Sequence, residues 1–392
     1  MLISSVGDPL TLTVSLVLLY QATRSPMAVA LAFGIQLLAA LSVGWLIGAV
    51  ADRLDRRRLI VRLEIVRFLV VLSLPLLAGF SVFLLYPALF VLGAIEALVV
   101  PSRQAAVPQL VTREQVGPAN AALLTATMLA QAVGFAVAGL GLANLQDPRV
   151  LYLADAASFA VAALIVSSLG DLGGGIATAR LKGGVRRAWA VPGVAPLLGV
   201  AAATVCVIGM LNTALLPAAY MFATKGASAY PILEVCLIAG TVMGSLIAGR
   251  ISSHLRVPAL AISLWVFAVT ITGVGLSSGL WPATLALALS GLANAVYSVT
   301  NTSALMDAAT SANRGTVMSA RFTVTQAGKA VGLCVGGLVT VWLGARTSFA
   351  AFGLGLAAVA VAYTVFVFNQ RRAAAATGAG AVQPFSQQGH QQ

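Results

Sequence analysis

Charged residues are scarce in this chain. Only 9% of its 392 residues are Asp, Glu, Lys or Arg, whereas soluble domains carry about 25% charged residues. So few charges exclude a soluble fold of this length. In their place the chain has 59% hydrophobic residues and a mean hydropathy of +0.97. This composition predicts an all-α protein that is embedded in a lipid bilayer.

Histidine and cysteine are scarce too. The two histidines, His254 and His390, lie in a loop and in the C-terminal tail. Cys206, Cys236 and Cys334 fall inside apolar runs and have neither metal-ligand nor disulfide spacing. No span carries paired His, a zinc motif or a Ser-Lys or Ser-His pattern, which argues against an intramembrane enzyme. We therefore expect no catalytic residue, no metal and no cofactor.

Twelve apolar runs are long enough to cross a bilayer, for which about 20 residues are needed. Short polar or Gly- and Pro-containing gaps separate them. The predicted spans are residues 1–21, 26–50, 59–80, 83–100, 118–143, 150–169, 196–222, 230–251, 258–276, 280–300, 316–343 and 347–368.

The formal net charge of +12 comes from Lys and Arg in the short loops, so we interpret it as a topology signal and expect no nucleic-acid partner. If both termini are cytoplasmic, most of these residues lie inside, as loop charge bias requires. The basic residues that remain on the outer side are Arg24, Arg149, Lys225 and Arg346. Those within spans are Arg67, Arg321 and Lys329. We therefore predict a multi-pass protein with both termini in the cytoplasm.

The longest internal connection divides six spans from six. We predict an N-terminal six-helix bundle over residues 1–169, a basic cytoplasmic linker over 170–195 and a C-terminal bundle over 196–368. Residues 369–392 are rich in Ala, Gly and Gln, and we expect a disordered cytoplasmic tail. Because no basic residue precedes Arg24, we expect a natural chain that begins further upstream or an unusually short N-terminus.

The two halves show weak self-similarity, which is typical of transporters. At an offset of 198, AVGFAVAG (132–139) matches AVGLCVGG (330–337) in the fifth span of each half. The segment from Gly44 also matches the segment from Gly240 in the second span of each half. We infer a duplicated, pseudo-symmetric architecture. Its helix-packing glycines are Gly134, Gly139, Gly332, Gly336 and Gly337.

The sharpest motif lies between the second and third spans. Gly44, Gly48 and Asp52 recur every four residues, so they share one helix face on which a second helix can approach closely. The acid can meet the positive end of a neighbouring helix, and the basic residues hold the loop at the anionic cytoplasmic surface. The motif continues with Arg53, Asp55 and Arg56. The alternative, which we favour less, is a packed helix followed by a basic stop.

GAVADRLDRRRL (48–59) resembles the loop between helices 2 and 3 of the major facilitator superfamily, and the twelve-span plan extends the resemblance over the whole chain. The stretches ISSVGDPLTL, PSRQAAVPQLVTREQVGPANA, YLADAASFAVAALIV and ANRGTV are similar to the bacterial macrolide-efflux and enterobactin-exporter branch. The resemblance implies rocker-switch alternating access around a cavity lined by helices 1, 4, 7 and 10. It also implies a small-molecule substrate and export driven by proton entry.

One feature departs from the superfamily's drug–proton antiporters, which commonly carry Gly-Pro-x-x-Gly-Gly in helix 5. Here the stretch from Gly134 to Gly139 contains no proline. Because kinks need Pro, paired small residues or a bulge, a bend here must come from the glycines. This departure weakens the case for proton antiport.

Ionisable residues inside spans are expensive and mark function by default. Asp8 fits a proton or a cationic substrate, but Asp8-Pro9 is also a helix N-cap followed by Pro at the first helical position. Lys329 lies about 18 Å into its span. It can serve as a partner for Asp8 or for an anionic substrate group, or it can belong to a buried structural pair.

The remaining polar residues of the spans are predicted to form a gate pair, an intrahelical ion pair, or packing and cavity-lining positions. Glu96 and Arg321 lie at matching depths near the cytoplasmic side, which predicts a gate pair that closes in one state. Glu64 and Arg67 have the i, i+3 spacing of an intrahelical pair. We expect packing or rim positions for Asp155 and Glu234, and cavity-lining positions for Asn212, Asn294 and Tyr297.

The prediction is a secondary active transporter, not an enzyme. We expect a monomer in the bacterial cytoplasmic membrane that exports small apolar or amphipathic molecules, such as drugs, antibiotics or secondary metabolites, by proton-coupled antiport. Polar residues are few in the presumed cavity helices, which favours an apolar cargo. A proton-coupled nutrient symporter is the alternative. A membrane receptor is disfavoured because no sizeable soluble domain is present to pass on a signal.

Overall fold

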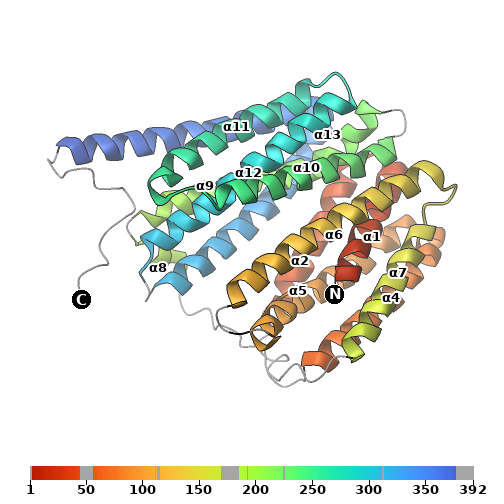
Figure 1. Ribbon diagram of the computed structural model, residues 1–392. Helices are drawn as coiled ribbons and strands as arrows, with labels where there is room; N and C mark the ends of the chain where they lie inside the picture. The colour runs from red at the N-terminus through yellow and green to blue at the C-terminus, as the bar shows by residue number, and fades with distance from the viewer. Residues whose placement is uncertain are drawn as a thin grey trace. The chain divides into compact units, whose positions relative to one another are not determined.

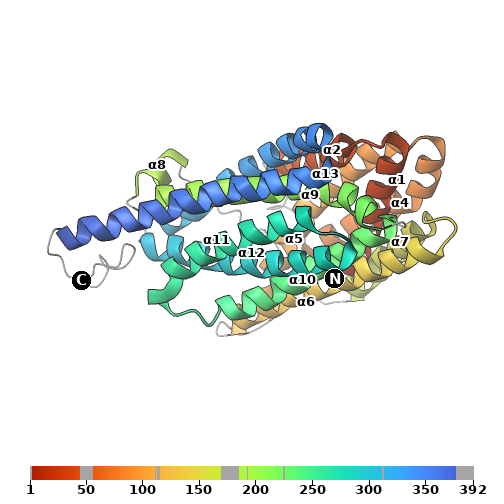
Figure 2. The ribbon, with the colours of Figure 1, turned by 90° about the horizontal axis from the view of Figure 1, so that it is seen from above.

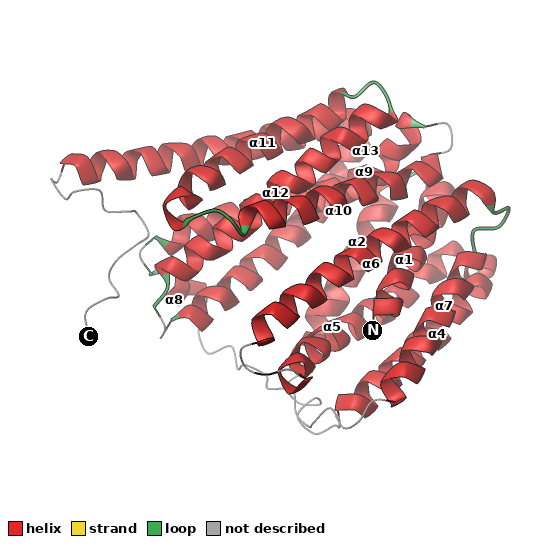
Figure 3. Cartoon of the chain, viewed as in Figure 1, coloured by secondary structure: helices red, strands yellow, loops and turns green. Residues whose placement is uncertain are grey.

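The computed structural model describes residues 2–44, 56–110, 112, 115–168, 185–191, 193–223, 226–310 and 313–376. Within these ranges the chain forms helices joined by short loops (Figure 3). The long apolar runs fold this way because a helix satisfies all its own backbone hydrogen bonds in lipid.

The long helices follow the chain order shown by colour and label in Figure 1. Their bounds are α1 Leu2–Thr23, α2 Pro26–Gly44, α4 Arg56–Phe80, α5 Leu85–Leu110, α6 Val116–Asn144, α7 Val150–Ser168, α9 Val194–Phe222, α10 Gly226–Ala248, α11 Arg256–Leu276, α12 Leu280–Ala308 and α13 Arg314–Ala376. The short elements are η2 Val82–Leu84, α8 Val185–Trp189 and η4 Ser253–Leu255.

The expected number of spans is confirmed. Ten helices of the described part are long and apolar enough to cross a membrane. The helix α4 adds another, and α13 consists of two helices because Gly344, with φ 76° and ψ 159°, breaks its helical backbone. A positive φ of this kind suits glycine, which has no Cβ. The protein is therefore an all-helical membrane protein with the predicted twelve-helix plan.

Several helices extend beyond the predicted spans. The helix α5 continues past Val100 to Leu110, and α12 continues past Thr300 to Ala308. The last helix reaches Ala376, so it enters the stretch from Asn369 that was predicted to be disordered. Hydropathy locates where a chain leaves the bilayer, whereas backbone hydrogen bonding can continue beyond that point. The hydropathy criterion therefore ended these helices too early.

The chain divides into two compact units, residues 1–179 with 219–235 and residues 180–218 with 236–392. In the first unit α1 packs on α6 and α7, α4 packs on α7, and α2 packs on α5. In the second unit α11 packs on α12 and α13, and Figure 2 shows α11 beside the blue α13.

These units differ from the predicted bundles in one respect: the α9–α10 connection belongs to the first unit. The ring of Tyr220 lies 5.2 Å from that of Tyr20, measured between centroids, and the Gln21 amide donates to the Tyr220 hydroxyl at 3.1 Å. The ring of Tyr230 meets that of Phe135 edge-on. These contacts pack the connection against α1 and α6.

Glycine contacts support the inferred repeat. A Cβ on Gly134 would lie 2.1 Å from the Val6 carbonyl oxygen of α1, and a Cβ on Gly332 would lie 2.0 Å from the Cys206 carbonyl oxygen of α9. The offset of 198 also relates Gly93, which approaches the backbone of Gln36, to Gly291, which approaches the Leu237 carbonyl. Equivalent spans of both halves therefore pack through equivalent glycines.

Candidate functional site

A buried arginine, Arg67, is the centre of the most highly charged site in the described spans. It lies on the third helix, α4, and only 3% of its side chain is exposed. Its guanidinium is 4.7 Å from the centroid of the Phe159 ring on α7. Stacking on an aromatic face favours an arginine that has left water.

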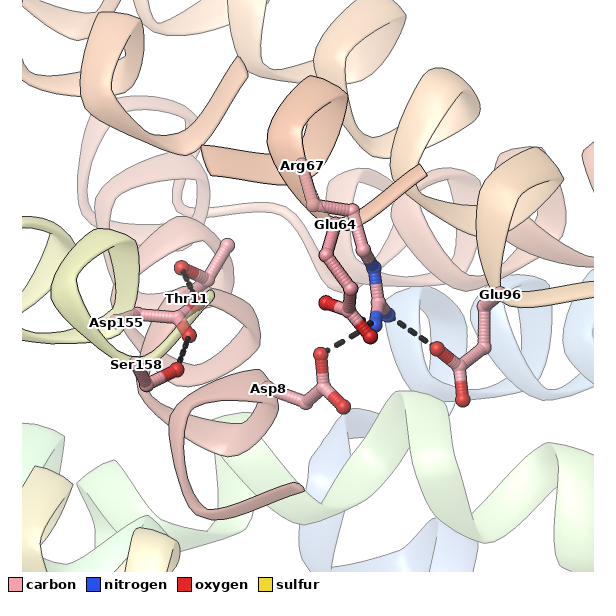
Figure 4. Close-up of polar contacts among 7 residues, drawn as sticks. All are labelled: Asp8, Thr11, Glu64, Arg67, Glu96, Asp155 and Ser158. Atoms are coloured by element: carbon pink, nitrogen blue, oxygen red, sulfur yellow. Dashed lines mark hydrogen bonds and ion pairs between the residues drawn. The ribbon is translucent and has the colours of Figure 1, made fainter. Parts of the chain in front are cut away.

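Carboxylates of three different helices surround this guanidinium (Figure 4). Its Nη2 donates to Oδ1 of Asp8 on α1 at 3.1 Å and also to Oε2 of Glu96 on α5. Its Nη1 lies 3.9 Å from Oε2 of Glu64, one turn earlier on α4. One nitrogen thus holds two carboxylates together, while Nε and Nη1 make no hydrogen bond to the described residues.

A fourth carboxylate, Asp155, comes from α7. It is fully buried and close enough to Arg67 to interact electrostatically. Thr11 donates to its Oδ2 at 2.5 Å, and Ser158 donates to its Oδ1 at 3.1 Å (Figure 4). A Cβ on Gly7 would lie 1.9 Å from Oδ1 of Asp155. The absence of a side chain at Gly7 thus makes room for this carboxylate.

Among the described residues, the acidic groups of this cluster outnumber its cation. One guanidinium faces four carboxyl groups, and carboxylates that share a site disfavour one another's ionisation. Such a cluster suits reversible proton binding inside a membrane.

The family model of the "Major Facilitator Superfamily" matches residues 2–172 and 197–387. The chain belongs to the Major Facilitator Superfamily. It is therefore a multi-pass membrane transporter of the secondary type and not an enzyme. No curated protein sequence matches the chain significantly.

Solved structures of superfamily transporters share the fold. The nucleoside transporter NupG is 14% identical, with a TM-score of 0.72 over 93% of this chain and 98% of that one. The D-xylose–proton symporter is 13% identical, with a TM-score of 0.69 over 92% and 96%. A bacterial homologue of the iron transporter ferroportin is 14% identical, with a TM-score of 0.67 over 92% and 96%. At such identities the similarity shows the fold alone.

Asp8 lies in the interior of its helix. Because α1 begins at Leu2 and contains Pro9, the N-cap interpretation of Asp8-Pro9 is wrong. A proline can be accommodated inside a membrane helix where other groups satisfy the freed backbone. Asp8 forms an ion pair with Arg67 at 3.1 Å.

Glu96 also lies farther from the end of its helix than predicted. Because α5 continues to Leu110, Glu96 is about 21 Å from the inner end of its helix, not one turn. Its partner within the first unit is Arg67. The predicted partner Arg321 belongs to the second unit, and their pairing in another conformational state stays a prediction.

Lys329 is partly buried on α13, and the described residues show no ion pair to it. Its predicted pairing with Asp8 also joins the two units and stays a prediction. Asn212 and Asn294 are partly buried, and Tyr297 is buried. Their role as cavity-lining groups is untested.

Sequence reasoning missed three members of the site. The predicted intrahelical pair of Glu64 and Arg67 is present at 3.9 Å, but Arg67 also hydrogen-bonds to two other helices, which was not predicted. Asp155 was assigned to packing or to the outer rim, but it lies in the same buried cluster. The signal that could have found them is the rarity of ionisable residues in spans, considered together over helices 1, 3, 4 and 6.

The other predicted residues fall into two groups. Most of the cytoplasmic loop motif lies outside the described residues: Gly48, Asp52, Arg53, Asp55 and the side chain of Arg56. Its first residue, Gly44, is the last residue of α2. The predicted packing glycines lie in helix contacts: a Cβ on Gly139 would be 3.3 Å from Pro231 and one on Gly336 would be 2.4 Å from Met210 Cα. Gly337 is buried.

Proposed function

We propose that this transporter exports small amphipathic molecules in exchange for protons, and that Asp8 and Glu96 carry the exchanged proton. The observation that supports the proposal is the single guanidinium of Arg67, which both carboxylates share. The proposal thus gives the coupling step to named groups.

Exposure separates the carboxylates that can exchange a proton from those that cannot. The side chains of Asp8 and Glu96 are 27% and 41% exposed, whereas the Glu64 side chain is fully buried. Asp155 is also fully buried and is held by two hydroxyl groups. Asp8 and Glu96 are therefore the carboxylates of this cluster that are open to proton exchange, while Glu64 and Asp155 hold Arg67 in place.

Proton binding changes the interactions of Arg67. A proton that binds to Asp8 removes its negative charge, so the charge attraction to Arg67 is then carried by Glu96 and the buried acids. Because helices α1, α4 and α5 all contribute, this change alters how tightly they are held together. A conformational equilibrium shifts only when its states differ in such an interaction. Proton entry can thereby favour the return step of an exporter.

The orientation and the branch belong to the same proposal. The excess of basic residues in the loops of one side supports a cytoplasmic location of both termini, and the resemblance to the bacterial macrolide and enterobactin exporters supports a bacterial cell membrane and outward transport. The few polar groups of the described spans suit a cargo that is largely apolar.

Proteoliposomes containing the purified protein test this proposal with erythromycin and enterobactin as probes. We expect transport of one of them when the proton gradient drives antiport, and no transport when an uncoupler removes the gradient. Transport in the same direction as the protons would indicate the uptake symporter. Transport that is unchanged by the uncoupler would contradict proton coupling.

A further inference from the structure

Acidic residues are distributed very unevenly between the two units. In residues 180–218 and 236–392 the only acidic residue is Asp307. It lies near the inner end of α12 and pairs with Arg256. Arg321 and Lys329, inside the membrane-spanning part of α13, therefore have no carboxylate of their own unit left to pair with. A cation held inside a membrane needs a counter-ion.

Buried donors without partners gather around Arg321. Among the described residues, no hydrogen-bond partner exists for Nε of Arg321 or the hydroxyl of Tyr363, and the hydroxyls of Tyr297 and Thr204 have at most each other. Arg321 lies within electrostatic range of Tyr297, which in turn neighbours Thr204 and Tyr363. Three helices, α9, α12 and α13, thus direct polar groups to one region of the second unit.

The burial of these groups makes their lack of partners costly. Tyr297 and Tyr363 are 3% and 2% exposed, and Thr204 is fully buried. A buried donor that lacks a partner costs about 1–3 kcal/mol, and more when it is charged. Such a set persists when another molecule satisfies it in the working cycle.

The chemistry of these groups selects an anion. A guanidinium can only donate, and its planar fork matches both oxygens of a carboxylate. The two phenol hydroxyls and the threonine hydroxyl can donate as well. A neutral or cationic ligand would leave the guanidinium charge uncompensated.

We propose that Arg321 and Tyr297, assisted by Tyr363 and Thr204, bind the carboxylate of an amphipathic organic anion. This inference rests on the proposed function, because it specifies one class of amphipathic cargo that the exporter carries. Lys329, about two turns further along α13, adds positive potential that attracts the same anion. The anionic group is then held by the second unit, while protons bind to the first.

Equilibrium binding tests this site without any proton gradient. The protein, in a neutral maltoside detergent, is titrated with radiolabelled 1-naphthylacetate, and unlabelled 1-naphthylacetamide serves as the neutral competitor of the same shape. We expect the carboxylate to bind at least tenfold more tightly than the amide. Arg321→Gln should abolish that preference, Arg321→Lys should keep part of it, and Tyr297→Phe should weaken binding severalfold.

Arg372→Gln is the matched control, because it removes one positive charge from α13 at a residue that stacks on Phe368 outside the site. Its binding should equal that of the wild type. If Arg321→Gln does not fold, the wild-type competition and Tyr297→Phe still decide the question. Equal competition by the amide, or no saturable binding of 1-naphthylacetate, would overturn the proposal.

The two proposals fail in different assays. Loss of gradient dependence in proteoliposomes, with the carboxylate preference intact, counts against proton antiport alone. A lost carboxylate preference, with gradient-driven export of a neutral cargo, counts against the anion site alone.

Discussion

At the residue scale, the site depends on which groups surround Arg67. Replacing Asp8 by Asn keeps an oxygen that can accept from Nη2 of Arg67 but removes the carboxylate that binds a proton. We expect normal expression and a loss of at least tenfold in transport driven by a pH gradient, with exchange of labelled cargo at equal pH largely kept. Flux measurements in proteoliposomes check this prediction.

The control for this variant is Asp147→Asn, which changes an exposed carboxylate near Arg149 outside the cluster. It should transport like the wild type. Gradient-driven transport by Asp8→Asn at the wild-type rate would eliminate Asp8 as the coupling residue and leave Glu96 as the candidate.

Arg67 itself is expected to stabilise the first unit. Its removal leaves the buried acids Glu64 and Asp155 without their cation, and breaking a buried pair in this way costs about 3–5 kcal/mol. Arg67→Gln should therefore lower the midpoint of thermal unfolding in detergent, followed as loss of the monodisperse peak. The double variant Glu64→Gln with Arg67→Gln should recover part of the loss.

Arg372→Gln is again the comparison, since Arg372 is exposed and stacks on the Phe368 ring. An unchanged midpoint for Arg67→Gln would mean that the acids are already neutral without the arginine. The same result would remove the electrostatic basis of the proposed proton site.

The site could be predicted only in part from the sequence. Asp8 and Glu96 were recognised because each is a lone acid inside an apolar span. Arg67 was not, because Glu64 at i−3 offered a local partner that satisfied the pattern. The contacts that decide its role come from α1 and α5, which are distant in sequence. Local spacing contains no information on such pairs.

At the element scale, the glycines of the repeat set how closely helices approach. A Cβ on Gly332 would lie 2.0 Å from the Cys206 carbonyl oxygen, so α13 and α9 would have to move apart. We expect Gly332→Ala to cost about 1–3 kcal/mol, as overpacking does. Thermal unfolding of the detergent-solubilised protein measures the effect.

The second helix of α13, after the break at Gly344, offers a matched control. A Cβ on Gly355 would meet nothing within 4 Å, so Gly355→Ala should be neutral or slightly stabilising because Ala favours helix. Equal midpoints for the two variants would show that the helices separate without cost at Gly332.

The elements themselves were largely predictable. Apolar runs identified the helices, and the offset of 198 identified the packing glycines before any contact was known. The inner ends of α5 and α12 were not found, because the criterion was hydropathy and not helix formation. The break at Gly344 was expected as a loop between two spans, and its positive φ is consistent with that turn.

At the scale of the whole molecule, the described spans divide their charges between the two units. The first unit holds Arg67 with four nearby carboxyl groups, and the second holds Arg321 and Lys329 without a spare acid. This division supports separate roles, with protons in one half and an anionic cargo in the other. A duplicated fold can diverge in this way because each half keeps its own helix packing.

Orientation is the remaining property of the whole molecule, and loop charge predicts it. The loops around Arg250, Arg256 and Arg314 fall on one side of the bilayer, while the loop at residues 277–279 falls on the other side and contains no Lys or Arg. Because Lys and Arg are retained in the cytoplasm, alkaline phosphatase fused after Ala376 should be inactive. The same enzyme fused within residues 277–279 should be active, since it folds only outside the cytoplasm. A green fluorescent protein fusion after Ala376 should be bright as the complementary control. The opposite pattern of activities would reverse the orientation, and with it the direction of proton-driven export proposed above.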